Sequence, residues 1–376
     1  MGSSENHVLP GRADVVVIGG GVMGAATLHY LVELGCRRPV LLERDTLASG
    51  STGHCAGGVR TLFSDELNVR IGLESIRRLE RFTDELGQQL DLRLYGYLFL
   101  LDNTVDVVRF KADLGLQATH GIATRMQTPA DAAAIVPQLS TEALVGAVFN
   151  PVAGTVTPDL VVQGYVGRAG ERGARIEQSC PVTRILVERG RVTGVETPRG
   201  RIATDRIVLT AGVWSRELAA SAGFDLPVEP ERRFMFFTED APAFPTELPL
   251  TIDFGTGFYF HREGRGLVFG GREQSLEEIA PVAARRLPAL GDLGIRSSWW
   301  GLYEMSPDHN ALVGAADDPS GLVYATGFSG HGFQQGPVIG EHLARVVLGL
   351  EPEFDLSQLA VERFGAGAER VERNVV

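Results

Sequence analysis

The residues best suited to chemistry near the start of the chain are three glycines spaced as Gly-x-Gly-x-x-Gly: Gly19, Gly21 and Gly24. In such a turn the first glycine permits a tight bend, the second lets the backbone approach a pyrophosphate, and the third allows close packing of a helix on a strand. The amides that open the helix then face the negative phosphates. Glu43 follows about 20 residues later, where a carboxylate accepts hydrogen bonds from ribose hydroxyls. The pattern predicts a bound dinucleotide, and the acid disfavours a 2′-phosphate.

This interpretation requires a strand before the turn and a helix after it, and the sequence pattern supplies both. The apolar run 15–18 is typical of a buried parallel strand. The apolar spacing over 22–34 predicts a helix that Gly35 caps. Residues 39–42 predict a second buried strand that ends at Glu43. Together these segments predict a βαβ unit.

Two further glycine-rich segments bear on which dinucleotide is bound. A nicotinamide dehydrogenase usually continues with regular βα units, but here the small and hydroxyl residues 49–60 follow the second strand. Such a run can wrap a pyrophosphate and admit a flat ring, or it can be a surface loop. Residues 327–333 lie between a predicted strand (322–325) and a predicted helix (336–348). A helix N-terminus there would stabilise an anionic reduced flavin, and a simple helix cap is the alternative.

The segments between these motifs predict a second domain. The apolar spacing of 68–86 indicates a long amphipathic helix. Residues 227–305 combine many aromatic side chains with short strand-like runs, which indicates an antiparallel sheet. Other predicted elements are a strand at 92–101, helices at 105–116 and 130–136, a hairpin over 182–196 and a strand at 206–209. The predicted fold class is α/β (α+β overall), with a Rossmann domain interleaved with the antiparallel-sheet domain.

The composition of the chain limits the kinds of binding partner that we expect. A formal net charge of −12 over 376 residues argues against nucleic acid and anionic membrane surfaces. The three cysteines, Cys36, Cys55 and Cys180, are odd in number and lack metal-ligand spacing. We therefore expect no metal site and a reducing, cytoplasmic compartment. No segment has the roughly 20 predominantly apolar residues that a membrane span requires.

The motifs together resemble the glycine oxidase, sarcosine oxidase and D-amino-acid oxidase family of FAD-dependent amine oxidoreductases, with sarcosine oxidase β-subunit-like members the most similar. The resemblance covers nearly the whole chain, and the last two of its segments are the most specific. These segments are 15–24 with Glu43 and Arg44, 51–60, 154–158, 210–214, 301–308 and 327–333.

The resemblance implies a glutathione-reductase-type FAD domain over residues 12–65, 151–225 and 306–350. It implies a substrate domain over 66–150 and 226–305, and a tail over 351–376. The implied reaction transfers hydride from the carbon next to an amine nitrogen to flavin N5, and water then hydrolyses the imine. The cofactor contacts assigned by the resemblance are Gly19, Gly21, Val22, Met23, Gly24, Glu43, Arg44, Ser51, Thr52, Ala56, Gly57, Gly58, Val182, Ala211, Gly212, Trp214, Gly301, Gly330, His331, Gly332, Phe333 and Gln334.

Several positions depart from the family pattern. Gly301 stands where monomeric sarcosine oxidases carry the cysteine bonded to the flavin, so non-covalent FAD is expected; His54 as a tether is the less favoured alternative. Val268 replaces a lysine that promotes the reaction with oxygen, which leaves a dehydrogenase plausible. Gln334 and Phe63 replace the lysine and arginine that hold a substrate carboxylate.

The substrate-facing candidates are therefore Arg60, Tyr259, Arg272 and Gln334, with Arg272 as a possible carboxylate anchor. Surface or core roles for Arg272 and Tyr259 remain alternatives. We expect a small secondary or N-methylated amino acid, or a related amine, as substrate, and oxygen or another electron acceptor. A flavin-bearing subunit of a hetero-oligomer and an NAD-dependent dehydrogenase are the competing hypotheses.

Overall fold

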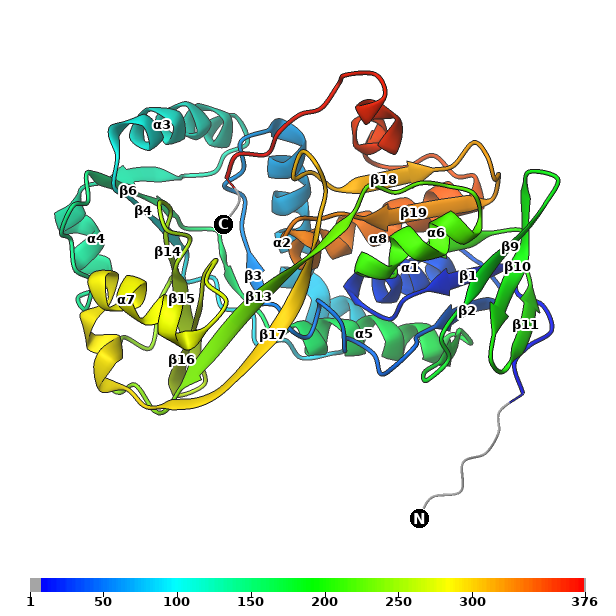
Figure 1. Ribbon diagram of the computed structural model, residues 1–376, viewed down its shortest axis with the longest axis horizontal. Coiled ribbons are helices and arrows are strands. Elements are labelled where there is room, and N and C mark those ends of the chain that lie inside the picture. The colour runs from blue at the N-terminus through cyan, green and yellow to red at the C-terminus, as the bar shows by residue number, and fades with distance from the viewer. Residues whose placement is uncertain (1–7, 375–376) are drawn as a thin grey trace, which may run out of the picture.

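A computed structural model describes residues 8–374 and places their strands in two large sheets and two small ones (Figure 1). In this part of the chain no helix is long and apolar enough to cross a membrane.

The six-stranded sheet carries the predicted dinucleotide turn. Its strands run in parallel, except that β18 is antiparallel to β19. The order is β18 (Leu312–Ala315), β19 (Leu322–Thr326), β12 (Ile207–Leu209), β1 (Val15–Ile18), β2 (Pro39–Leu42) and β8 (Arg175–Glu177). Alternate β1 residues enter different cores: Val15 and Val17 pack under the helices, and Val16 and Ile18 pack on the opposite face.

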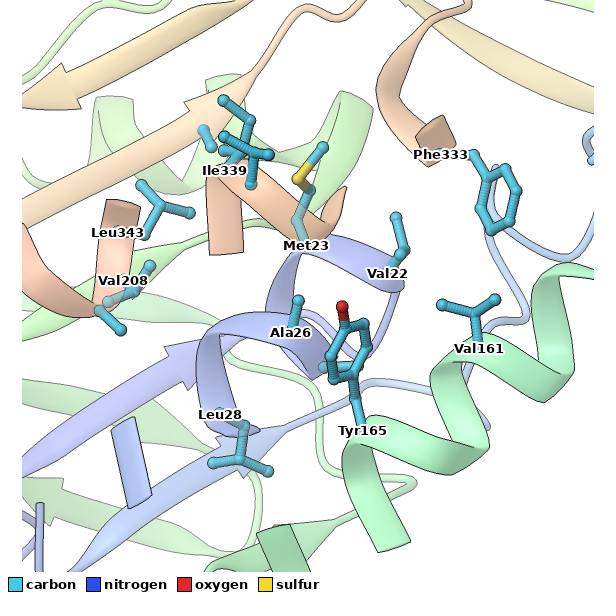
Figure 2. Close-up of a cluster of buried hydrophobic side chains, with 14 of the residues drawn as sticks. Val22, Met23, Ala26, Leu28, Val161, Tyr165, Val208, Phe333, Ile339 and Leu343 are labelled. Carbon is cyan, nitrogen blue, oxygen red and sulfur yellow. The ribbon is translucent and has the colours of Figure 1, made fainter. Parts of the chain in front are cut away.

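Helices α1 (Val22–Glu33), α5 (Pro158–Glu171) and α8 (Gly332–Leu348) cover the first of these faces (Figure 2). Glycines bring α1 and α8 close together. A Cβ at Gly336 would lie 2.6 Å from Val22 Cγ2, and one at Gly340 would lie 2.3 Å from Ala26 Cβ. Only a helix face without side chains can approach so closely. The opposite face packs on α6 (Ser215–Ser221) and on the sheet of β9 (Arg184–Glu188), β10 (Arg191–Thr197) and β11 (Gly200–Ala203).

The eight-stranded sheet is antiparallel except where β14 pairs in parallel with β4. Its order is β17 (Ile295–Met305), β13 (Glu229–Thr238), β16 (Gly266–Gly270), β15 (Tyr259–Glu263), β14 (Leu250–Asp253), β4 (Tyr97–Leu101), β6 (Gly146–Asn150) and β5 (Arg125–Gln127). The associated helices are α3 (Thr104–Thr119), α4 (Pro129–Ile135) and α7 (Leu276–Arg286). Between the large sheets lie α2 (Glu66–Leu86) and the short pair β3 (Gly58–Val59) and β7 (Gly154–Thr155), while the long strands β13 and β17 extend from one sheet toward the other (Figure 1).

The structure confirms the predicted fold class, and two element boundaries differ from the prediction by four residues or more. α8 begins at Gly332, not at residue 336, because its packing on α1 offsets the poor helix propensity of its glycines and Pro337. β4 begins at Tyr97, not at residue 92, because Gly96 has a φ of +93° and interrupts the strand. Both differences arise from backbone conformation and packing that residue patterns do not encode.

Candidate active site

A cavity of about 480 Å³ opens at the carboxyl ends of β1, β2, β12 and β19. Open α/β sheets bind ligands at this edge. Fifteen of the predicted cofactor residues line the cavity: Gly19, Gly21, Val22, Met23, Glu43, Arg44, Ser51, Thr52, Val182, Ala211, Gly212, Trp214, Gly330, Gly332 and Phe333.

The glycine turn has the geometry that a dinucleotide requires. Gly19 has a φ of +109°, and a Cβ there would lie 2.3 Å from the Thr210 carbonyl oxygen. A Cβ at Gly24 would lie 1.9 Å from the Gly19 carbonyl oxygen, so the helix touches the turn directly. The nearest neighbour of a Cβ at Gly21 is Thr52 Oγ1, at 3.0 Å across the turn. Gly19 and Gly24 are therefore needed for the backbone path, and Gly21 keeps the cavity open.

Glu43 is held at the end of β2 by two backbone amides. Gly20 N donates to Glu43 Oε2 (2.7 Å), and Asp45 N donates to Oε1 (2.8 Å). A carboxylate oxygen has further lone pairs, so Glu43 can still accept from ribose hydroxyls in the cavity. Next to it, the Arg44 guanidinium lies 3.6 Å from the centre of the Trp214 ring. These side chains form a polar and flat wall that suits a nucleoside.

In the loop after β2, Ser51 and Thr52 line the cavity, whereas the later residues pack against neighbouring segments of the chain. Ser51 Oγ donates to the Leu302 carbonyl oxygen (2.6 Å), and Thr52 Oγ1 accepts from Val22 N (3.1 Å). Ala56, Gly57 and Gly58 do not line this cavity. A Cβ at Gly57 would lie 2.2 Å from the Val156 carbonyl oxygen, and one at Gly58 would lie 1.8 Å from the Tyr97 hydroxyl oxygen. In the structure these two glycines allow β3 to pass close to its neighbours.

The C-terminal glycine turn also divides its side chains. Gly330, Gly332 and Phe333 line the cavity, whereas His331 and Gln334 contact Arg60. Arg60 N donates to Gln334 Oε1 (2.7 Å), and Arg60 Nη2 lies 3.0 Å from His331 Nε2. The guanidinium also lies 4.2 Å from the centre of the Phe63 ring. Phe63 and Gln334, the two substitutions expected to remove a substrate clamp, thus both contact Arg60.

Three tyrosines lie at or near the cavity, and the sequence patterns single out only one of them, Tyr259, as facing substrate. Tyr303 lines the cavity, and Tyr97 and Tyr259 are close enough to influence its surroundings electrostatically. Burial raises the pKa of each hydroxyl above its ordinary value, so all three stay protonated. Arg233 on β13 lies with its guanidinium 5.2 Å from the centre of the Tyr303 ring. The alternation of β13 places it on the same face as Met235 and Phe237, which pack with Tyr259.

Glu304 is a second cavity residue that sequence reasoning did not identify. Burial raises its pKa to about 7, although a hydrogen bond from Thr326 Oγ1 to Oε2 (2.9 Å) favours the ionised form. Its charge therefore changes near neutral pH. No residue pattern signals this, because the shift depends on the groups that surround the Glu304 carboxyl in the folded chain.

The remaining predicted positions lie outside this cavity. Arg272 is exposed, and its Nε lies 2.9 Å from where a Cβ of Gly257 would be. A Cβ at Gly301 would lie 2.8 Å from His54 Cβ. Val268 is buried against Met235 and Phe237. The roles predicted for Tyr259, Arg272 and Gly301 stay predictions.

The residues of the cavity fit FAD: a glycine turn without side chains, helix N-termini for phosphates and a ribose carboxylate. The fold and the cavity thus define a flavoprotein of the oxidoreductase type. Residues 14–346 match the family described as FAD dependent oxidoreductase (DAO). The chain belongs to this family.

Individual relatives agree with the family. Mitochondrial sarcosine dehydrogenase of Homo sapiens is 30% identical over 97% of this chain and 43% of its own length. The 4-methylaminobutanoate oxidase (formaldehyde-forming) of Paenarthrobacter nicotinovorans is 28% identical over 96% of this chain and 47% of its own length. The solved structure of L-proline dehydrogenase from P. horikoshii superposes with a TM-score of 0.90 at 29% identity, covering 96% of this chain and all of that one. The chain spans less than half the length of the two curated relatives.

These comparisons confirm the predicted family and the use of FAD, and they remove the NAD-dependent alternative. The protein is an FAD-dependent oxidoreductase.

Replacing Gly21 with valine is expected to abolish FAD binding, because the side chain would enter the space between the turn and Thr52. The absorbance of the purified variant in the flavin bands measures this. Gly115→Val is the matched control, because no atom lies within 4 Å of a Cβ at Gly115. A Gly21→Val protein that retains the flavin of the wild type would contradict the placement of the pyrophosphate.

Proposed function

We propose that the protein oxidises the C–N bond of a small secondary or N-methylated amino acid, or of a related amine. The observation that carries this proposal is the group of Tyr97, Tyr259 and Tyr303 near the buried, cationic Arg60, with Tyr303 in the cavity lining. The names of the relatives support it, because sarcosine, proline and 4-methylaminobutanoate are all secondary amines that carry a carboxylate.

The surroundings of the inner cavity favour the reactive form of an amine. An amine must lose its proton before the neighbouring C–H bond can be oxidised, and FAD, when bound, supplies the acceptor of the two electrons. Burial disfavours an ammonium ion, and the nearby Arg60 charge disfavours it further. Both effects lower the pKa of a bound amine, so no dedicated base is required.

Recognition of the substrate carboxylate requires a cation with free donors. Arg60 is engaged by protein acceptors, and Arg272 is exposed away from the cavity. Arg233 is mostly buried beside Tyr303 and is paired with Glu231 on its own strand. We propose Arg233 as the carboxylate anchor, with Arg272, the anchor expected from the sequence, as its rival.

The electron acceptor is proposed to be a species other than oxygen. Val268 occupies the position at which the resemblance expects an oxygen-activating lysine, and it lies 1% exposed in an apolar cluster. Two of the three relatives named above are dehydrogenases. The second candidate, an oxidase, is favoured by the name of the Paenarthrobacter nicotinovorans relative.

We further propose that the flavin is bound without a covalent bond. Gly301 has no side chain, and His54, which is not among the residues that line the cavity, donates from Nδ1 to the Gly50 carbonyl oxygen (2.9 Å). Cys55 lines the cavity, but burial raises the pKa of its thiol to about 12, which suppresses the nucleophilic thiolate.

Three further proposals concern the domain boundaries, the cellular compartment and the assembly of the protein. We propose the domain boundaries given above, because each large sheet draws its strands from the corresponding segments. All three cysteines are free, which supports a reducing cytoplasm as the compartment. Assembly with another subunit is proposed from the resemblance to sarcosine oxidase β-subunit-like members.

Anaerobic titration with sarcosine, proline and 4-methylaminobutanoate is expected to bleach the flavin absorbance with at least one of them. Dye reduction should then far exceed peroxide formation in air. A flavin that no secondary amine reduces would contradict the proposed substrate class. Peroxide formation at the rate of dye reduction would instead establish an oxidase.

Arg233→Ala is expected to raise KM for an amino-acid substrate by about tenfold or more, while KM for a matching amine without carboxylate changes little. The physical reason is the loss of a charge-assisted, two-point hydrogen bond to the carboxylate. Arg272→Ala is the matched variant and should leave both KM values near the wild type. The reverse result would return the anchor to Arg272.

Acid precipitation of the holoenzyme is expected to leave the yellow flavin in the supernatant, because nothing bonds it to the chain. Absorbance of the redissolved pellet provides the measurement. Flavin that stays with the pellet would disprove the non-covalent proposal, and a His54→Ala variant would then test the alternative tether.

A further inference from the structure

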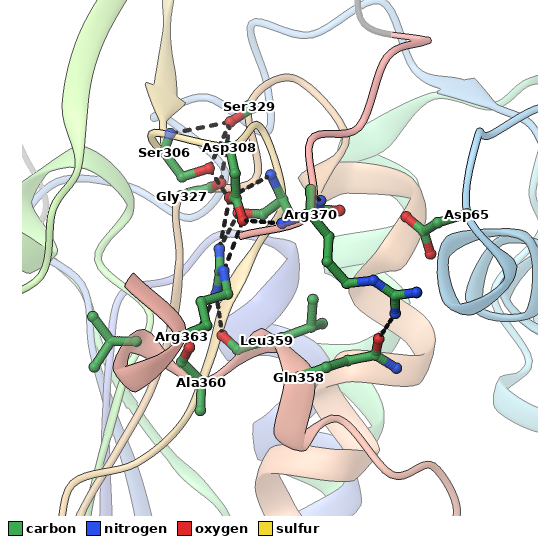
Figure 3. Close-up of polar contacts among 12 residues, drawn as sticks. Asp65, Ser306, Asp308, Gly327, Ser329, Gln358, Leu359, Ala360, Arg363 and Arg370 are labelled. Atoms are coloured by element: carbon green, nitrogen blue, oxygen red, sulfur yellow. Dashed lines mark hydrogen bonds and ion pairs between the residues drawn. The ribbon is translucent and has the colours of Figure 1, made fainter. Parts of the chain in front are cut away.

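The C-terminal segment, defined as residues 360–374, returns from the edge of the six-stranded sheet toward the space between the two large sheets (Figure 1). Its first fixed point is a buried ion pair (Figure 3). Arg363 Nε lies 2.8 Å from Asp308 Oδ2, and Arg363 Nη2 lies 2.8 Å from Asp308 Oδ1. Burial opposes ionisation of Asp308, but Arg363 outweighs it and holds the pKa of that carboxyl below its ordinary value. The segment is thus fixed to the motif 301–308.

The second fixed point is Glu372, which is 1% exposed. Its Oε1 accepts from Ser64 N (3.0 Å) and from Asn374 N (2.8 Å). Its own amide donates to the Asp308 carbonyl oxygen (3.1 Å). Glu372 therefore joins the loop after Arg60 to the next residues of the C-terminal segment.

The third fixed point is the contact with Arg60. Arg60 Nη2 donates to the Asn374 carbonyl oxygen (2.6 Å), a contact between residues 314 positions apart in the sequence. The other acceptors of the guanidinium are the Leu62 carbonyl oxygen and His331 Nε2. In the described part of the chain no carboxylate forms an ion pair with Arg60. The carboxylate whose charge acts on Arg60 is that of Glu372.

These contacts fix the state of His331 as well. An arginine only donates hydrogen bonds, so His331 Nε2 must accept and the proton of the neutral ring lies on Nδ1. Burial and the Arg60 charge lower the pKa of His331 well below its ordinary value, which keeps the ring neutral. His331 stands between Gly330 and Gly332, which line the cofactor cavity, and it precedes the first turn of α8.

We propose that the C-terminal segment positions Arg60 and His331 at the wall of the cofactor cavity, with Glu372 and Asn374 as its positioning residues. Arg60 is a large buried cation, and no carboxylate of the described residues forms an ion pair with it. Three neutral acceptors therefore hold the guanidinium in place: the Leu62 carbonyl oxygen, the Asn374 carbonyl oxygen and His331 Nε2. Withdrawing the Asn374 carbonyl leaves Nη2 a single acceptor, His331, and frees the guanidinium to move. The kinetic consequence of this proposal rests on the proposed function, whereas the contact itself does not.

A substitution can remove the negative charge of Glu372 and still keep its main hydrogen bonds. Burial and the proximity of Glu372 raise the pKa of Asp65, so the two carboxylates repel one another. In Glu372→Gln the oxygen at the Oε1 position still accepts from Ser64 N and Asn374 N, and the amide nitrogen can donate to Asp65. Only the longer contacts of Oε2 with Ser64 N (3.2 Å) and Asn68 Nδ2 (3.4 Å) are lost. Glu372→Gln should therefore preserve the position of the segment, whereas Glu372→Ala should release it.

The test compares Glu372→Ala, Glu372→Gln and a matched control, Glu369→Ala, in the FAD-loaded full chain. Glu369 lies exposed in the same segment. Hydrogen exchange of the backbone amides in 59–64 and 331–334 reports the contact, and anaerobic flavin bleaching reports its consequence. In Glu372→Ala we expect faster exchange in both segments, an altered absorbance spectrum of the bound flavin and bleaching slowed about tenfold to a hundredfold. Glu372→Gln and Glu369→Ala should resemble the wild type in all three measurements.

Each other outcome has a defined meaning. Wild-type exchange in Glu372→Ala would overturn the proposal, and so would faster exchange with an unchanged flavin spectrum and bleaching rate. If Glu372→Ala does not fold, Asn374→Ala replaces it. That change keeps the backbone carbonyl that Arg60 contacts but removes the side-chain anchor of this residue on Asp113 Oδ2 (3.0 Å), so the same three changes are expected at smaller size, and wild-type behaviour would overturn the proposal. If no amine bleaches the wild-type flavin, the proposed function fails, while exchange and the spectrum still decide whether the segment positions Arg60.

Discussion

The close contact between the Gly19–Gly24 turn and its surroundings is the constraint on which the rest of the structure depends. The Gly19 carbonyl oxygen lies where a Cβ of Gly24 would be, and the Thr210 carbonyl oxygen lies where a Cβ of Gly19 would be. α1 can therefore start directly above the ends of β1 and β12. Gly336 and Gly340 bring α8 against the same helix, so that two helix N-termini point toward one cavity. Side chains at any of these positions would separate the elements and remove the phosphate site.

Electrostatics at the inner end of the cavity depend on a different constraint, the burial of Arg60. The guanidinium has no carboxylate at ion-pair distance in the described residues, and a buried charge without compensation is costly. Carbonyl oxygens of Leu62 and Asn374, together with His331, supply that compensation. The same unneutralised charge disfavours a second cation nearby. Under the proposed function, this charge would link the packing of the C-terminal segment to the protonation state of a bound amine.

Phe63 and Gln334, two of the residues that depart from the family pattern, have a common structural explanation, because both contact Arg60. Phe63 packs against the Arg60 guanidinium, and Gln334 accepts from the Arg60 amide. The resemblance implies that these two positions hold a substrate carboxylate in the family. In this chain they help to fix the buried Arg60 instead. Under the proposed function a cation that recognises substrate would come from elsewhere, and the proposed candidate is Arg233 on the long strand β13, whose guanidinium lies 5.2 Å from the centre of the Tyr303 ring.

The sequence by itself determined the βαβ unit, the dinucleotide turn, the carboxylate at the end of β2 and the family. Each of these depends on local backbone requirements, such as a glycine at positive φ or a short apolar run, that residue types express directly. It did not locate the start of α8, because tight packing on α1 overrides the poor helix propensity of Gly332 and Pro337. Only the tertiary structure brought Tyr97, Tyr303 and Arg233 together, raised the pKa of Glu304 to about 7 and joined Asn374 to Arg60. These features depend on burial and on contacts between segments far apart in the chain, which no spacing of residues records.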